Sequence, residues 1–201
     1  MDYPKSISKE DINRLPQQDY PGKIELILTP EAAIKAAHAL SKATILGFDT
    51  ETRPSFSADQ QFQVSLLQLV TESTAYLFRL RWTGLPAELV AVLANPAITK
   101  VGVAIRDDIK ALQKLTPYEP AGFIDIAHEA EKRGFKNFGL RGLTAIFLGT
   151  RLSKTAKLTN WDNERLSPAQ LAYAANDGLV SINIYQKLMS LPVSQHNVRK
   201  R

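Results

Sequence analysis

The sequence predicts an α/β fold, in which helices flank a mixed β-sheet within a single domain. The chain has 201 residues, a length that suits one large domain. Apolar residues make up 44% of it, enough to build a substantial core. Strand-like segments come early, and helical and strand-like segments alternate afterwards. That order is typical of an α/β fold with a mixed sheet.

Residues 1–80 are expected to hold four strands and one helix. A strand at 24–28 precedes a helix that runs to about Ser41, because Thr29 can cap its free N–H groups and Pro30 suits its first turn. Polar residues 71–74 predict the turn of a hairpin. The remaining strands are predicted at 45–51, 64–70 and 75–80.

Helices dominate the chain after residue 80. The last helix begins with a capping box, in which Ser167 is the cap, Pro168 lies in the first turn and Gln170 can reach back to the cap. Gly178 lies inside this helix and would let it approach a strand closely. The predicted elements are helices at 86–93 and 107–115, strands at 98–103 and 123–125, a helix after Asp125 as its cap, and helices at 140–148 and 168–189.

Composition divides the chain into a central domain and two flanking segments. Residues 1–22 are polar and contain three prolines, so we expect an extended N-terminal arm. Residues 23–191 are expected to form the domain. Residues 192–201 are expected to form a basic tail.

The charge balance favours a polyanionic partner. Lys and Arg exceed Asp and Glu by 25 to 20, giving a net charge of +5 and a pI of about 9.4. Such a balance suits nucleic acid, because cationic side chains release counterions from phosphates. There is no cysteine, which excludes disulfides and thiolate zinc sites and favours a cytoplasmic location. No signal peptide or membrane-spanning run is recognised, so no membrane association is expected.

Four acidic residues and one tyrosine carry the chemistry. Asp49 and Glu51 are two apart on a predicted strand, so both side chains point to the same face. Tyr173 and Asp177 are four apart on a predicted helix and therefore share a face. Like charges repel, so a fold that gathers these acids needs cations between them.

A further acid lies at the start of the helix predicted at 107–115. Asp108 is favoured as the inward-facing residue, because apolar Leu112 lies four residues later on the same face. Asp107 is the alternative, since either acid could instead cap the helix and interact with its dipole.

Together these motifs resemble the DEDDy branch of the 3′–5′ exonucleases, the family of ribonuclease D and the Werner-syndrome-type exonuclease domain. The resemblance covers about residues 24–190. It implies a ribonuclease H-like fold and an enzyme that releases nucleoside 5′-monophosphates from DNA or RNA with a free 3′ end. The matching segments are 48–51, 64–69, 101–108 with Leu112, and Trp161 followed by 166–177.

The motif set suggests a two-metal mechanism. Asp49, Glu51 and Asp177 are expected to bind one Mg²⁺ or Mn²⁺, since oxygen ligands favour hard cations. Asp49 would bridge to a second ion, held directly or through water by Asp108. Tyr173 would orient the attacking water.

Basic and aromatic residues around the acids are candidates for substrate contacts. Phosphates would be bound by some of the cationic residues, and the terminal base could stack on an aromatic ring. Three histidines, His38, His128 and His196, fit no ligand spacing. The candidates are Arg53, Lys110, Arg141, Arg151, Lys154 and Lys157, with Phe56, Phe62 and Phe138.

Two other functions remain open from the sequence. One is a non-catalytic nucleic-acid-binding module on a ribonuclease H-like fold. The other is a different enzyme of that fold, such as an endonuclease or a resolvase. The sequence does not choose between DNA and RNA, and no protein partner can be inferred from it.

Overall fold

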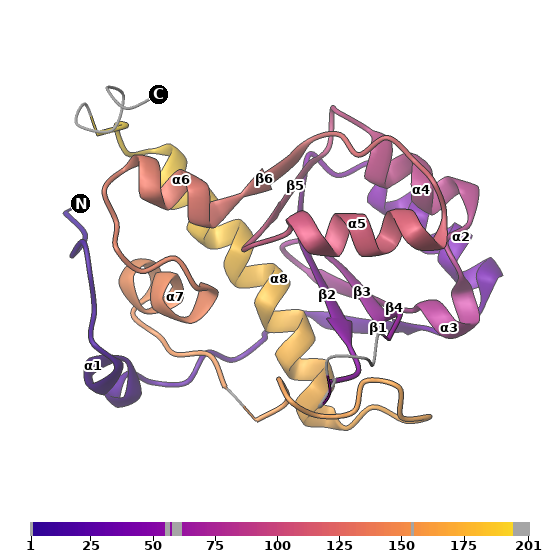
Figure 1. Cartoon of the computed structure of the whole chain (residues 1–201), viewed down its shortest axis with the longest axis horizontal. Coiled ribbons are helices and arrows are strands. Elements are labelled where there is room, and N and C mark those ends of the chain that lie inside the picture. Colours follow the sequence, from indigo (N-terminus) through magenta and orange to yellow (C-terminus); the bar gives the residue numbers. More distant parts are fainter. Residues whose placement is uncertain (1, 55–56, 58–61, 154, 195–201) are drawn as a thin grey trace.

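A computed structural model describes residues 2–54, 57, 62–153 and 155–194. Phe56, Lys154 and His196 lie outside the described residues, as does most of the predicted basic tail. The described part is a three-layer α/β structure, with one sheet between two layers of helices (Figure 1). None of its helices is both long enough and apolar enough to cross a bilayer.

The central sheet has six strands in the order β1-β4-β3-β2-β5-β6. β3 runs antiparallel to its neighbours β2 and β4, whereas the other neighbouring pairs are parallel. This is the predicted mixed sheet. The strands are β1 (Lys23–Ile27), β2 (Ile45–Thr52), β3 (Val64–Val70), β4 (Thr74–Arg79), β5 (Thr99–Gly102) and β6 (Phe123–Asp125).

Helices cover both faces of the sheet. One face packs against α2 (Pro30–Leu40), α3 (Leu80–Thr83), α4 (Ala87–Ala94) and α5 (Arg106–Leu115). The opposite face packs against the long helix α8 (Pro168–Met189), with α6 (Ile126–Lys132) and α7 (Leu140–Leu148) beside it (Figure 1).

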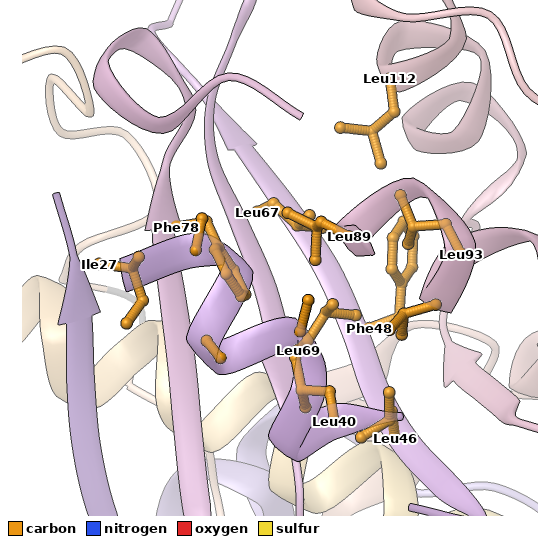
Figure 2. Close-up of a cluster of buried hydrophobic side chains, with 14 of the residues drawn as sticks. Ile27, Leu40, Leu46, Phe48, Leu67, Leu69, Phe78, Leu89, Leu93 and Leu112 are labelled. Carbon is orange, nitrogen blue, oxygen red and sulfur yellow. The ribbon is translucent and has the colours of Figure 1, made fainter. Parts of the chain in front are cut away.

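The α2–α5 side contains an apolar cluster that anchors the strand carrying the first acids. Leu46 and Phe48 of β2 are fully buried there, with Leu67 and Leu69 of β3 beside them (Figure 2). The ring of Phe48 meets that of Phe123 edge-on, with centroids 5.0 Å apart. Because side chains alternate along a strand, these anchors leave the intervening residues of β2 facing α8.

α8 is buried around most of its circumference. Its Ala174, Ala175 and Leu179 pack on Leu66 and Val70 of β3. Farther along, Val180, Ile182, Ile184 and Leu188 pack with residues of α6 and α7. The helix is therefore held on several sides, which fixes the positions of its polar side chains.

The predicted elements are confirmed to within a residue or two at most ends, with two differences. The four-residue helix α3 was not predicted. The expectation of a wholly extended arm is wrong for Lys9–Arg14, which form helix α1. Ser8 caps α1 by accepting a hydrogen bond from the N–H of Asp11 at 3.0 Å, and Ile12 is buried.

The N-terminal segment lies along the α7 side of the molecule. The ring of Tyr3 lies 4.7 Å from that of Phe147. The N–H of Gln18 donates to the carbonyl of Arg151 at 2.9 Å, and the N–H of Arg151 donates to the carbonyl of Pro16. These bonds attach residues 16–18 to the segment that leads from α7 toward α8.

Candidate metal centre

The C-terminal half of β2 presents two carboxylates to α8. A β-carbon placed on Gly47 would collide with the backbone of Gly178, so this face of β2 is the one that α8 covers. Asp49 and Glu51 lie two and four residues after Gly47 and share that face. The predicted common direction of the two acids therefore agrees with the structure.

α8 brings the third carboxylate to the same place. Its capping box is complete, because Ser167 accepts from the N–H of Gln170 at 3.2 Å and Gln170 accepts from the N–H of Ser167 at 2.9 Å. Asp177 is 4% exposed and directly precedes Gly178, where helix and strand touch. The crossing point thus fixes Asp177 next to the acids of β2.

Asp49, Glu51 and Asp177 form what we call the three-carboxylate group. One oxygen of each residue can be chosen so that all three lie within 4.8 Å of one another. Carboxylate oxygens at this spacing suit a hard divalent cation such as Mg²⁺ or Mn²⁺. The residues therefore fit the metal that their chemistry implies.

Burial raises the pKa of every member of this group, and repulsion by neighbouring acids raises the pKa of Asp49 and Glu51 further. Desolvation is the largest cause for each residue. It raises the pKa of Glu51 to about 8 and that of Asp177 to about 7. The pKa of Asp49 is also raised well above its usual range, by burial and then by the neighbouring charges of Asp177 and Glu51. A cation among the three would reverse this effect.

The structure does not bring Asp108 into the three-carboxylate group. Asp108 lies in the first turn of α5, where its carboxylate accepts a very short hydrogen bond from the Thr50 hydroxyl. It is nevertheless close enough to raise the pKa of both Asp49 and Glu51. This position suits a ligand of a second ion or of its water shell.

Asp107 points away from the centre. Its side chain is 92% exposed and pairs with Lys110 at 3.7 Å. The sequence left Asp107 and Asp108 as alternatives, and this geometry favours Asp108.

The start of α5 is held in place by Asp125. One oxygen of Asp125 caps α6 at Ala127 and also accepts the N–H of Ala104 at 3.1 Å. Ala104 has a φ of 59°, an uncommon conformation for a residue with a β-carbon. The hydrogen bond from Ala104 to Asp125 stabilises this turn, which directs Asp108 toward β2. Asp125 is thus a helix cap, as predicted, with this additional contact.

Tyr173 lies one turn before Asp177 on α8. Its hydroxyl interacts with the carboxylate of Asp177 and lowers the pKa of that acid, and its ring centroid is 6.1 Å from that of the fully buried Trp161. Burial and then the charges of the three acids raise the pKa of Tyr173 far above its usual value. The phenol therefore stays protonated at neutral pH and can donate a hydrogen bond at the site.

A cavity of about 320 Å³ opens beside Tyr173 and Asp177. Arg141 and Lys157 supply positive charge, and Leu140, Leu152 and Leu158 supply apolar surface. A second cavity, of about 250 Å³, shares Tyr173 and Asp177 and is closed on its other side by residues 17–20. Space for a substrate therefore adjoins the acids directly.

The predicted basic contacts separate into different environments. Lys157 is exposed and lowers the pKa of Glu51 and Asp177, whereas Lys110 pairs with Asp107. The guanidinium of Arg151 donates to the carbonyl of Leu15 at 3.0 Å, which gives it a structural partner. Arg53 lies over the ring of Phe62 at 4.7 Å.

The other candidates contribute little to the cavities. Phe138 is 44% exposed and lies outside both sets of lining residues. His38 lies on the exposed side of α2, as expected, and His128 pairs with Glu131 on α6.

Sequence reasoning missed Thr50, the hydrogen-bond partner of Asp108. Its position between Asp49 and Glu51 was the available signal. Because side chains alternate along a strand, the side chain of Thr50 points away from those of Asp49 and Glu51 and toward α5.

Comparisons with known proteins agree with this geometry. The family model of the 3′–5′ exonuclease domain matches residues 24–191. The bifunctional 3′–5′ exonuclease/ATP-dependent helicase WRN of Mus musculus is 34% identical over 159 residues, covering 76% of this chain and 11% of that protein. Exonuclease 3′–5′ domain-containing protein 2 of Drosophila melanogaster is 35% identical over 148 residues, covering 72% of this chain and 25% of that protein.

A solved structure has the same fold. Escherichia coli RNase D, described as an exoribonuclease involved in structured RNA processing, is 26% identical with a TM-score of 0.75. The match covers 84% of this chain and 44% of that one. The ribonuclease H-like fold is thereby confirmed. The chain belongs to the 3′–5′ exonuclease family, and residues 24–191 are its 3′–5′ exonuclease domain.

Proposed function

We propose that this protein removes nucleotides one at a time from the 3′ end of DNA or RNA, in a reaction that needs two divalent cations. The observation that carries the proposal is the position of Tyr173 and Asp177. Both line a cavity with cationic and apolar walls, and Asp177 also belongs to the three-carboxylate group. The cavity and the proposed metal ligands thus share Asp177.

The acids divide into two ligand sets. Asp49, Glu51 and Asp177 would hold one Mg²⁺ or Mn²⁺, while Asp49 and Asp108 would hold the second. Ions bound in this way neutralise charge on the reacting phosphate and lower the pKa of water. Thr50 keeps the carboxylate of Asp108 in a fixed orientation through its hydroxyl.

Tyr173 would position the attacking water. Its neutral hydroxyl can both donate and accept a hydrogen bond over the physiological pH range. Asp177 and Trp161 restrict its movement from two sides. A water held by this hydroxyl beside the acids would be available for in-line attack on the terminal phosphodiester.

The cavity would hold the 3′-terminal part of the strand. Arg141 and Lys157 can bind phosphate oxygens, and Leu158, which is 76% exposed, can contact a base or sugar. These contacts draw a polyanion to a centre that is itself negative. Hydrolysis at that point would release a nucleoside 5′-monophosphate.

A digestion assay tests the proposal. Matched linear DNA and RNA oligonucleotides, labelled at the 5′ end, are incubated with Mg²⁺, with Mn²⁺, or with EDTA. We expect a ladder that shortens stepwise from the 3′ end with metal and none with EDTA. This chain covers only part of the length of the relatives reported above, so the preference for DNA or RNA must be determined with such a panel.

Two controls separate the other functions. A circular single strand should stay intact, whereas an endonuclease or a resolvase would open it. If the protein bound the linear oligonucleotide but did not shorten it, the result would instead favour the non-catalytic binding module.

A further inference from the structure

Gln68, in the middle of β3, is a buried amide without a hydrogen-bond partner. Its relative exposure is 0%, and neither Nε2 nor Oε1 is bonded. A buried polar group left unpaired costs about 1–3 kcal/mol. Such groups are uncommon in native proteins and call for a reason, such as a role at a site or an enclosed water.

The register of the sheet places Gln68 directly opposite Asp49. These two residues are partners in the antiparallel pairing of β2 with β3. Partners of this kind point to the same face, with β-carbons about 4.5–5.5 Å apart. Leu66 and Val70, which flank Gln68 at spacings of two, pack against α8. The amide therefore lies under α8, adjacent to the inner side of Asp49.

The acids beside Gln68 still have hydrogen-bonding capacity to fill. One oxygen of Asp49 accepts the N–H of Thr50 at 2.8 Å, and Oδ1 of Asp177 is buried without a partner. Carboxylates that bind metals are commonly held by a hydrogen bond from a neighbouring residue, which fixes their orientation. Nε2 of Gln68 offers two N–H donors on the face of the sheet that also carries Asp49.

We propose that Gln68 is a positioning residue of the metal centre. Its amide holds the carboxylate of Asp49 in the orientation that binds metal, either directly or through one enclosed water. This inference rests on the proposed function, because it assigns Gln68 to the ions that the three-carboxylate group would bind.

The test uses Gln68→Met, which preserves most of the side-chain volume and removes both polar ends. Mn²⁺ binding to the metal-free protein is measured by calorimetry, and the melting temperature is measured without metal. We expect Mn²⁺ affinity to fall by about 10–100-fold. The melting temperature should stay the same or rise, because two unpaired polar atoms are gone.

Tyr118→Phe is the matched control. The Tyr118 hydroxyl is also buried and unpartnered, but it packs against the apolar cluster on the opposite face of the sheet. This variant should bind Mn²⁺ like the wild type. In digestion assays, the Mn²⁺ concentration for half-maximal rate should rise about 10–100-fold for Gln68→Met alone, with much of the rate regained at saturating Mn²⁺.

Other outcomes would overturn the inference. Equal Mn²⁺ affinity in Gln68→Met and wild type would do so. A large loss of melting temperature in both Gln68→Met and Gln68→Leu would show that Gln68 only supports the core. If the wild type itself bound no Mn²⁺, the proposed function would fail together with the inference. If the wild type bound Mn²⁺ and Gln68→Met bound it equally well, only the inference would fail.

Discussion

A β-carbon on Gly47 would lie 2.7 Å from the Cα of Gly178, so β2 and α8 touch backbone to backbone where these two glycines meet. Asp49 lies two residues after one glycine, and Asp177 lies one residue before the other. The close crossing therefore sets the separation of the carboxylates. Gly178 costs about 1 kcal/mol relative to Ala inside a helix. A β-carbon on Gly178 would collide with Cγ2 of Val70 on β3, which explains the glycine at this position.

Gly47→Ala should both destabilise the protein and weaken metal binding. The obstructing atoms belong to the backbone of Gly178 and cannot rotate away. Overpacking of this kind typically costs about 1–3 kcal/mol, and the displaced helix would carry Asp177 away from Asp49. Urea unfolding gives the first effect, and calorimetry with Mn²⁺ gives the second.

The control for this change is Gly139→Ala. A β-carbon on Gly139 would have nothing within 4 Å, and its φ of −75° suits any residue. We expect a loss of about 1 kcal/mol or less and unchanged Mn²⁺ affinity. Similar losses in the two variants would contradict the importance of the glycine contact.

Asp177→Asn should abolish turnover and leave the protein folded. The substitution removes one of three mutually repelling charges, so the metal-free melting temperature should not fall. Replacing an anionic carboxylate ligand by a neutral amide should lower the rate by at least about a hundredfold. Melting curves and digestion rates measure the two effects.

Asp107→Asn is the matched control, since that residue faces solvent and pairs with Lys110. It should keep a near-normal rate, whereas Asp108→Asn should lose much of the rate. The reverse result would reassign the acid at the start of α5 to Asp107.

Local rules predicted much of the site. Spacings of two on a strand and four on a helix correctly paired Asp49 with Glu51 and Tyr173 with Asp177. The cap of α8 could also be predicted, because it depends only on residues within one helical turn. The helix period also favoured Asp108 over Asp107, in agreement with the structure.

Those rules could not predict contacts between residues that lie far apart in the sequence. The hydrogen bond from Thr50 to Asp108 joins residues 58 positions apart. The backbone bonds that attach residues 16–18 to Arg151 span more than 130 positions, as does the bond from the guanidinium of Arg151 to the carbonyl of Leu15. Helix α1 was missed because burial of Ile12 against the domain adds to the weak local preference of a short segment.

Tyr173→Phe should slow hydrolysis but leave metal binding intact. The ring still packs against Trp161, while the hydroxyl that would orient the water is lost. We expect the rate at saturating metal and substrate to fall by about a hundredfold. Mn²⁺ affinity, measured by calorimetry, should change little. Tyr185→Phe on the same helix controls for loss of a hydroxyl and should keep its rate.

The stability of the metal-free protein should decrease as pH rises from about 5 to 8. Folding raises the pKa of Glu51 from 4.5 to about 8 and that of Asp177 from 3.8 to about 7. Between those limits the folded state binds more protons than the unfolded state, so raising the pH favours unfolding. Mg²⁺ should stabilise the protein more at pH 8 than at pH 5, because it binds the ionised carboxylates.

Melting temperatures with Mg²⁺ and with EDTA across this pH range test the relationship. Other groups also titrate, so the same series on Glu51→Gln isolates the contribution of one acid. That variant should show a shallower pH dependence without metal. An unchanged slope would contradict the raised pKa of Glu51.

Lys157→Ala should weaken substrate binding more than it slows the chemical step. Lys157 lines the cavity beside Tyr173 and lies near the acids without being one of the proposed metal ligands. We expect KM for a single-stranded oligonucleotide to rise about 3–10-fold, with kcat at saturating Mg²⁺ changing less. If Lys157 binds one phosphate, the slope of log kcat/KM against log salt concentration should become shallower by about 0.7.

Lys110→Ala is the control, because it removes an equal charge that pairs with Asp107 instead. It should leave this slope near the wild-type value. Equal slopes for Lys157→Ala and the wild type would place the substrate path outside this cavity.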